Sequence, residues 1–260
     1  IIGAALQQGT QSSNLGRIAA MAAGLPASVS GMTIDRQCSS GLMSIATAAK
    51  QIVMDGSPIV VAGGCESISL VQNEHMNITR IIDPLAIAHS PDIYMGMLDT
   101  AELVANRYNI SREAQDEYAA QSQQRTAAGQ AAGKFDDEIV ALTATKLVAD
   151  RETGAISEEP VTLSKDEGNR PSTNVEGLAG LKTVRENGFI TGGNASQLSD
   201  GAAAVVMMDS TLASQRNLEP LGVYRGMAVA GCEPNEMGIG PVFAIPKLLA
   251  RNGLTMDDIG

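Results

Sequence analysis

Cys38 is the residue of this chain whose type and setting best suit covalent chemistry. It stands in the middle of the stretch Asp35-Arg36-Gln37-Cys38-Ser39-Ser40-Gly41-Leu42. The apolar residues 29–34 precede this stretch and residues 42–54 follow it with helical spacing. The pattern predicts a strand, a tight turn and a helix. A thiol at such a turn lies near the positive end of the helix, which favours the nucleophilic thiolate.

A second interpretation of Cys38 stays open on these residues alone. A free cysteine is one of the most commonly buried residue types, so a small core residue would look the same in sequence. A helix end also stabilises a thiolate only in part, and a cysteine nucleophile still requires a general base beside it. The wider sequence has to decide between a nucleophile and a core cysteine.

Composition narrows the classes of function. The chain has 260 residues, 44% of them hydrophobic, and a formal net charge of −11. We expect no nucleic-acid partner, because such a partner requires a basic face. We also expect no membrane span, because no stretch of 18 apolar residues occurs. The cysteines are odd in number, widely spaced and without a CxxC pair, so we predict a reducing, cytoplasmic compartment and no metal site.

The two ends indicate a partial chain. The sequence opens without methionine and enters a helical pattern almost at once, and it stops just after another helical pattern. We expect residues to be missing at both ends. An organellar targeting peptide could have been lost with the missing N-terminus.

Alternating strands and helices predict the α/β class. Residues 72–190 are more polar than the rest and read as an insertion over the core. The helix at 42–54 is apolar nearly all round and is predicted to be buried. The expected strands are 29–34, 59–62, one starting at 138–140, 201–208 as a buried strand, and 221–230; the expected helices include 14–24, 42–54, 97–108, 111–132, 211–217 and 241–252.

At this point the stretch around Cys38 resembles the nucleophile motif of the thiolases. Other segments resemble that family in the same order along the chain. They are Val61-Ala62-Gly63-Gly64-Cys65-Glu66-Ser67, Met95-Gly96, Thr100-Ala101-Glu102, Ser111-Arg112-Glu113, Gln115-Asp116, Asp137-Glu138-Ile139-Val140, Asp166-Glu167, Arg170-Pro171 and Gly193-Asn194-Ala195-Ser196-Gln197-Leu198-Ser199-Asp200-Gly201-Ala202-Ala203. The resemblance covers nearly the whole chain.

The resemblance implies a thiolase-like fold. That fold has two similar βαβαβαββ halves in a layered αβαβα arrangement, with a loop domain inserted in the first half. By analogy, residues 1–71 and 191–217 form the N-terminal half, and residues 72–190 form the inserted loop domain. Residues 218–260 would begin the C-terminal half.

The resemblance also implies the reaction. Thiolases are acyltransferases that cleave 3-oxoacyl-CoA with CoA to acyl-CoA and acetyl-CoA, or run the reverse condensation, as in β-oxidation and other fatty acid metabolism. Cys38 matches their nucleophile, which carries the acyl group as a thioester. CoA is then a substrate, and no permanently bound cofactor is expected. The family implies a homo-oligomer, a dimer or a homotetramer.

Some expected parts are absent from these residues. Thiolases carry an Asn-Glu-Ala-Phe motif, a His-Pro motif and a Cys-x-Gly-Gly motif in the second half, and none occurs here. These motifs hold an oxyanion-hole asparagine, the histidine base and a second acid/base cysteine. We therefore expect this chain by itself to be poorly active or inactive.

Five further residues are candidates for substrate binding. Tyr94 and Met95 match positions that line the acyl pocket, although some thiolases have histidine where Tyr94 stands. Ala244 and Ile245 match the stretch that contacts the pantetheine arm, and Arg216 could meet a CoA phosphate. Ordinary packing stays open for Tyr94 and Met95, and a solvated surface role for Arg216. Thiolases often have serine where Ile245 stands, which weakens the contact expected there. The two histidines, His75 and His89, fit surface or loop positions better than a catalytic role.

Two other functions are compatible with parts of the sequence. A β-ketoacyl synthase shares the fold and a cysteine at the same helix, but the Arg36-Gln37 lead-in and the Asn194-Ala195-Ser196 segment argue against it. A truncated homologue that binds acyl-CoA without catalysis is the second alternative, and it rests on the absent second-half motifs.

Overall fold

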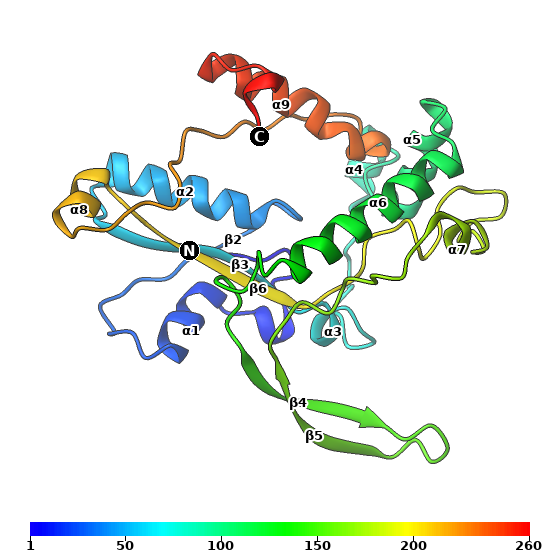
Figure 1. Cartoon of the computed structure of the whole chain (residues 1–260), viewed down its shortest axis with the longest axis horizontal. Helices are drawn as coiled ribbons and strands as arrows, with labels where there is room; N and C mark the ends of the chain where they lie inside the picture. Colours follow the sequence, from blue (N-terminus) through cyan, green and yellow to red (C-terminus); the bar gives the residue numbers. More distant parts are fainter. The chain divides into compact units, whose positions relative to one another are not determined.

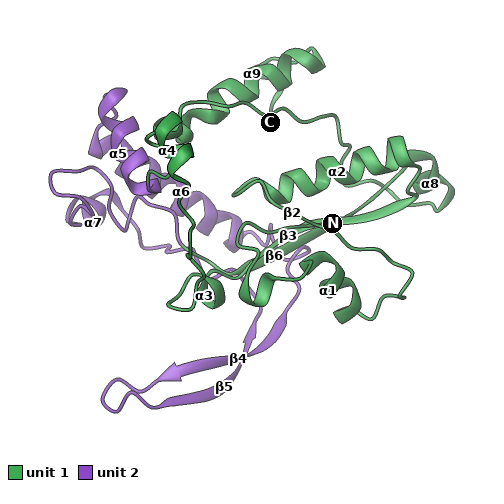
Figure 2. Cartoon of the chain, turned by 180° about the vertical axis from the view of Figure 1, so that it is seen from behind, with its two compact units in different colours: residues 1–95, 198–260 green, residues 96–197 purple.

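The computed structural model describes residues 1–260, which divide into two compact units. Unit 1 comprises residues 1–95 and 198–260, and unit 2 comprises residues 96–197 (Figure 2). The polar composition of residues 72–190 predicts an insertion over that range, and both boundaries of unit 2 come later in the chain. No helix combines the length and apolar character that crossing a membrane requires.

Unit 1 holds the larger sheet and most of the helices. Its strands are β1 (Ile2–Gly3), β2 (Thr33–Ile34), β3 (Ile59–Glu66) and β6 (Gly201–Met208). Its α-helices are α1 (Leu15–Ala22), α2 (Ser40–Asp55), α3 (Ile68–Val71), α4 (Pro84–His89), α8 (Ser210–Gln215) and α9 (Gly240–Asn252). Short 3-10 helices occur at η1 (Gly9–Gln11), η2 (Pro234–Ile239) and η3 (Met256–Asp258).

The sheet of unit 1 has the strand order β2-β1-β3-β6. β1 pairs in parallel with β2 and with β3, whereas β6 runs antiparallel to β3 along its whole length. Helix α2 covers one face of this sheet and α1 covers the other (Figures 1 and 2). Parallel strands with helices on both faces confirm the predicted α/β class.

Burial along α2 and β6 differs from the prediction. Ala46, Ala48 and Ala49 of α2 are buried, but Val53 and Met54 near its end are each 78% exposed. The helix is therefore covered only along part of its surface. The apolar run of β6, the edge strand of the sheet, is exposed from Gly201 to Val206. An apolar pattern alone does not show whether the faces of a strand will be covered.

Three predicted strands are shorter, displaced or absent. Residues 29–32 form no strand, because the Arg17 guanidinium of α1 binds the carbonyls of Ala27 and Val29. Residues 221–230 also form none. There, Lys247 and Arg251 of α9 donate to the carbonyls of Val229 and Met227. The strand expected from 138–140 begins instead at Leu142.

Unit 2 contains helices and one hairpin. Its helices are α5 (Met97–Arg107), α6 (Arg112–Ala131) and α7 (Val175–Ala179), and its strands are β4 (Leu142–Ala149) and β5 (Ile156–Leu163). The Ser111 hydroxyl caps α6 by accepting the Ala114 N–H at 3.2 Å, as its position before the helix predicts. The two strands pair antiparallel and are exposed on almost all of their residues.

Candidate active site

Cys38 lies in the turn, residues 35–39, that joins β2 to α2, and its side chain is exposed. This placement differs from the buried core cysteine that the local sequence left open. Because β1, β2 and β3 are parallel, their carboxyl ends meet at one edge of the sheet, and the turn leaves from that edge. Loops at this edge are where open α/β sheets bind ligands.

The backbone of the turn is held in a demanding conformation. Gln37 has a φ of 46°, in the left-handed region that non-glycine residues occupy at a cost of order 1–3 kcal/mol. The Gln37 N–H donates to the Asp35 carboxylate at 2.6 Å. The Arg36 carbonyl accepts the N–H of Ser39 at 3.1 Å and its hydroxyl at 2.9 Å. Both polar groups of the peptide between Arg36 and Gln37 are thus hydrogen-bonded.

The start of α2 is seated directly on the sheet by small residues. A Cβ on Gly3 of β1 would lie 2.3 Å from the Ser40 carbonyl carbon, so only glycine fits there. Gly64 of β3 lies beside Gly41, where a Cβ would make an ordinary contact of 3.5 Å with the Gly41 Cα. One turn further on, the buried Ser44 hydroxyl donates to the Gly63 carbonyl at 2.7 Å. The N-terminus of α2 is therefore held close to the strands.

Replacing Gly3 with alanine should loosen this seat. The new methyl group would meet backbone atoms of Ser40, which can yield only if the helix moves away from β1. We expect the free energy of unfolding to fall by about 1–3 kcal/mol, as overpacked sites usually show. Urea denaturation measures the change. Gly222→Ala is the control, since nothing lies within 4 Å of its Cβ position. An equal effect of both substitutions would contradict the close-packing argument.

The helix terminus supplies the electrostatic setting for the thiol. Cys38 precedes Ser39, the N-cap of the 16-residue helix α2. The unpaired N–H groups of a helix N-terminus carry partial positive charge, which stabilises an anion placed there. No side chain caps this end. The same N–H groups can receive negative charge that develops on a bound carbonyl oxygen.

Cys65 has the opposite setting. It lies near the end of β3 and is half-buried. Burial raises the pKa of the Cys65 thiol, and the carboxylates of Glu66 and Asp200 raise it further. The Ser69 hydroxyl and N–H hold the pKa of the Asp200 carboxyl below its usual range, so this neighbour stays negative. Cys65 is accordingly disfavoured as a nucleophile.

Glu66 organises the loop after β1. Its carboxylate accepts the Ala5 N–H at 2.7 Å and the Gln11 side-chain amide at 2.6 Å. Gln11 is 2% exposed, and its side-chain carbonyl accepts the Ser67 N–H at 2.7 Å. Nothing in the sequence patterns had singled out Gln11. These contacts tie the carboxyl ends of β1 and β3 together at the edge from which the Cys38 turn leaves.

The structure brings together the segments that carry four of the predicted substrate-binding residues. Tyr94 is exposed and its hydroxyl accepts the Asp83 N–H at 3.0 Å, whereas Met95 is half-buried. Two residues before Tyr94, the Asp92 carboxylate accepts the Asn235 amide at 2.6 Å. Asn235 belongs to η2, which leads directly into α9 with half-buried Ala244 and exposed Ile245.

Arg216 lies away from Cys38. It follows α8, which comes after the end of β6 that pairs with Ile59. Ile59 follows the C-terminal end of α2, so the length of α2, about 24 Å at 1.5 Å per residue, separates that end from the Cys38 turn. Both histidines are exposed, as predicted for surface positions, and His75 lies 3.7 Å from the equally exposed Glu74.

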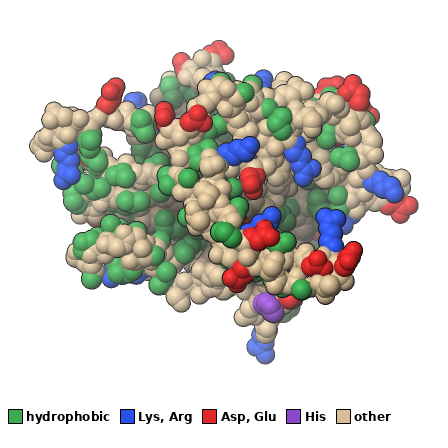
Figure 3. Space-filling model, turned by 60° about the horizontal axis from the view of Figure 1, so that its bottom comes forward, with side chains coloured by type: hydrophobic (Ala, Val, Ile, Leu, Met, Phe, Trp, Pro, Cys, Tyr) green, Lys and Arg blue, Asp and Glu red, His purple; other side chains and the backbone are tan.

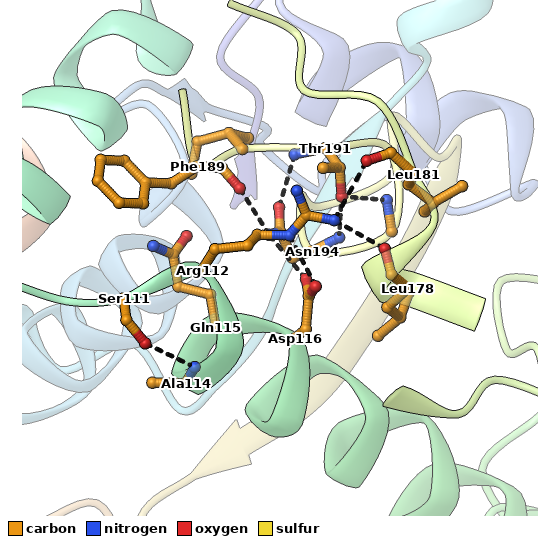
Figure 4. A network of polar contacts seen from close by, with 12 residues as sticks. Ser111, Arg112, Ala114, Gln115, Asp116, Leu178, Leu181, Phe189, Thr191 and Asn194 are labelled. Carbon is orange, nitrogen blue, oxygen red and sulfur yellow. Dashed lines mark hydrogen bonds and ion pairs between the residues drawn. The ribbon is translucent and has the colours of Figure 1, made fainter. Parts of the chain in front are cut away.

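Motifs of unit 2 that are far apart in sequence meet in one buried polar network (Figure 4). Asp116 is 2% exposed and accepts Arg112 Nε at 2.7 Å and the Asn194 amide at 3.0 Å. Arg112 also donates to the Leu178 carbonyl at 2.7 Å. The side-chain carbonyl of Asn194 accepts the backbone N–H of fully buried Thr191 at 2.8 Å. In this structure, Asn194 is thus a scaffold residue.

A second cluster joins α5 to the same segment of unit 2. The Glu102 carboxylate accepts the N–H of Phe189 at 2.8 Å and that of Ile190 at 2.9 Å. Arg185 pairs with Asp99 at 2.7 Å on the surface. The Arg185 guanidinium beside it holds the pKa of the Asp99 carboxyl below its usual value. Unit 2 is therefore held together in part by hydrogen bonds from three of the thiolase-like segments. They are Thr100-Ala101-Glu102, Gln115-Asp116 and Gly193-Asn194.

Comparison with known families agrees with this geometry. Residues 1–211 match the family described as "Thiolase, N-terminal domain", and residues 218–260 match "Thiolase, C-terminal domain". The chain is 44% identical over 264 residues to a Bacillus subtilis protein named 3-ketoacyl-CoA thiolase. That alignment covers 100% of this chain and 66% of the relative, so the chain spans less than two thirds of that protein.

Solved structures agree with the fold. A human mitochondrial 3-ketoacyl-CoA thiolase in complex with CoA superposes with a TM-score of 0.80 at 34% identity, covering 99% of this chain and 64% of that one. A Bacillus anthracis acetyl-CoA acetyltransferase gives 0.80 at 37% identity, with coverages of 99% and 65%. These matches confirm the predicted thiolase-like fold. With family matches over nearly all of its length, the chain belongs to the thiolase family.

Proposed function

We propose that the protein carrying this chain is a thiolase that cleaves or forms 3-oxoacyl-CoA, with Cys38 as its nucleophile. The observation that carries the proposal is the exposed thiol on a rigid turn at the positive end of α2. A substrate can reach the exposed sulfur of Cys38 more readily than the half-buried sulfur of Cys65. Family membership over nearly all of the chain gives this geometry its chemical context.

The proposed reaction proceeds through a thioester on Cys38. The thiolate attacks the ketone carbonyl of 3-oxoacyl-CoA, and the carbon–carbon bond next to that carbonyl then breaks. The departing carbon takes up a proton and leaves as acetyl-CoA, while the acyl group stays on sulfur. A second CoA thiolate takes the acyl group and frees Cys38. The covalent intermediate divides one difficult step into two easier ones.

The substrates and partners follow from this proposal. Acyl-CoA and CoA are the proposed ligands, and a solved relative is described in complex with CoA. Tyr94, Met95, Ala244 and Ile245 are proposed to line the acyl and pantetheine path, because Asp92 and Asn235 hold their two segments together. CoA is long and its phosphates lie far from its thiol, so Arg216 remains the proposed phosphate contact despite its distance from Cys38.

Domain organisation and assembly are proposed on similar grounds. Residues 1–71 with 191–217 form the proposed N-terminal half, 72–190 the loop domain and 218–260 the start of the C-terminal half. A homo-oligomer is proposed, supported by exposed Ile18, Val205 and Val206 on unit 1. Hydrophobic side chains gather on the left of Figure 3. The cytoplasmic location stays a prediction.

Acylation of the protein tests the proposed function directly. Incubation of the intact protein with acetyl-CoA should add the mass of one acetyl group, and peptide mass spectrometry should place it on Cys38. The exposed thiol at the helix end is the reason for this selectivity. The Cys38→Ser and Cys65→Ser variants form the matched pair. If acetylation persisted in Cys38→Ser and disappeared in Cys65→Ser, the nucleophile would be Cys65 and the proposal would be wrong.

A further inference from the structure

We propose that Ser40 is a positioning residue for Cys38. Its hydroxyl clamps the two residues before the cysteine and so sets the direction in which the turn presents the thiol. The inference rests on the proposed function, since positioning matters for the reaction only if Cys38 is the nucleophile. It goes further by assigning a role to a side chain that does not reach the reacting atoms.

The Ser40 hydroxyl accepts one hydrogen bond from the turn and donates another to it. It accepts the Arg36 N–H at 2.8 Å and donates to the Gln37 carbonyl at 2.6 Å. The Ser40 N–H donates to the same Gln37 carbonyl at 3.0 Å. The residue is 4% exposed, so water cannot easily replace these bonds. The first residue of α2 therefore closes a ring around the Arg36–Gln37 backbone.

The clamp acts where the chain would otherwise relax. Gln37 has a φ of 46°, and a non-glycine residue leaves this region unless its surroundings hold it there. Rotation at Gln37 would turn the peptide that leads into Cys38. Both the Cys38 side chain and its backbone N–H would then point elsewhere. The hydroxyl thus acts on Cys38 through Gln37.

A purely structural role for this hydroxyl can be separated from positioning. Ser44 lies one turn further along α2, is fully buried, and uses its hydroxyl to join the helix to β3 through the Gly63 carbonyl at 2.7 Å. It makes no hydrogen bond to residues 35–39. The two serines therefore differ in what their hydroxyls hold, the turn or the sheet, which makes Ser44→Ala a matched control.

The first test compares the reactivity of the thiol in intact, folded variants. We expect Ser40→Ala to slow iodoacetamide alkylation of Cys38 and acetyl transfer from acetyl-CoA about 10-fold each, as the loss of one buried hydrogen bond allows. The loss should appear in kcat, with KM for acetyl-CoA little changed. Ser44→Ala should keep both rates within about threefold of the parent. Equal losses in the two variants would overturn the positioning role.

The second test uses glycine at position 37, which adopts positive φ without strain. Ser40→Ala should cost about 10-fold in alkylation rate when residue 37 is glutamine, and less than about threefold when it is glycine. Additive losses would show that Ser40 does not act through Gln37 and would overturn the inference. Failure of the proposed function looks different: Cys38→Ser would still be acetylated, whatever the rates at Ser40.

Discussion

Replacing Cys38 with alanine should abolish thiolysis in the intact protein. We expect the rate of 3-oxoacyl-CoA cleavage to fall by about 10⁴-fold or more, because removing the proposed nucleophile removes the whole proposed covalent route. Loss of 3-oxoacyl-CoA in the presence of CoA measures the rate. The fold should survive, since the side chain is exposed and outside every helix and strand.

Cys65→Ala is the matched control for this substitution. Cys65 is half-buried, and the pKa of its thiol is raised by burial and by two neighbouring carboxylates. Its removal should leave the rate within about threefold of the parent, the loss expected from minor repacking. If Cys38→Ala kept substantial activity while folded, acyl transfer would not pass through this turn.

Replacing Asp116 with alanine should destabilise unit 2 strongly. Asp116 is 2% exposed and holds both Arg112 and Asn194. Its loss leaves a guanidinium that is mostly buried without its carboxylate, and breaking a buried pair in this way typically costs about 3–5 kcal/mol. A denaturant titration monitored by circular dichroism should show the decrease in the free energy of unfolding.

The exposed pair in the same unit provides the comparison. Asp99 and Arg185 are as close, at 2.7 Å, but both side chains are about half exposed. Asp99→Ala should therefore change the stability little, because water and salt screen the pair. A result in which Asp99→Ala costs as much as Asp116→Ala would contradict the view that burial makes the Asp116 network important.

Local patterns predicted many elements of this structure. The helices over 14–24, 97–108, 111–132 and 241–252 all form within a few residues of the predicted bounds. Their ends are written in the sequence: Ser111 caps α6, and Gly253 ends α9 with a positive φ of 63°. Such signals act between residues that are near one another in the chain, so a single sequence displays them.

Predictions that depended on distant partners did less well. Residues 221–230 have a strand-like pattern, but the carbonyls of Met227 and Val229 accept hydrogen bonds from side chains of α9. The apolar runs of α2 and β6 gave no indication that many of their residues would be exposed. An apolar run records which residues could be covered, whereas the position of the element in the sheet decides whether they are.

The Cys38 stretch shows the division most clearly. Sequence patterns alone predict a cysteine at a strand–turn–helix junction with small residues and family motifs around it, because these are properties of neighbours in the chain. Three further features come from the tertiary structure: the exposed thiol, the close approach of α2 to Gly3, and the left-handed backbone of Gln37. These features arise from backbone approach and torsion, which residue types permit without specifying.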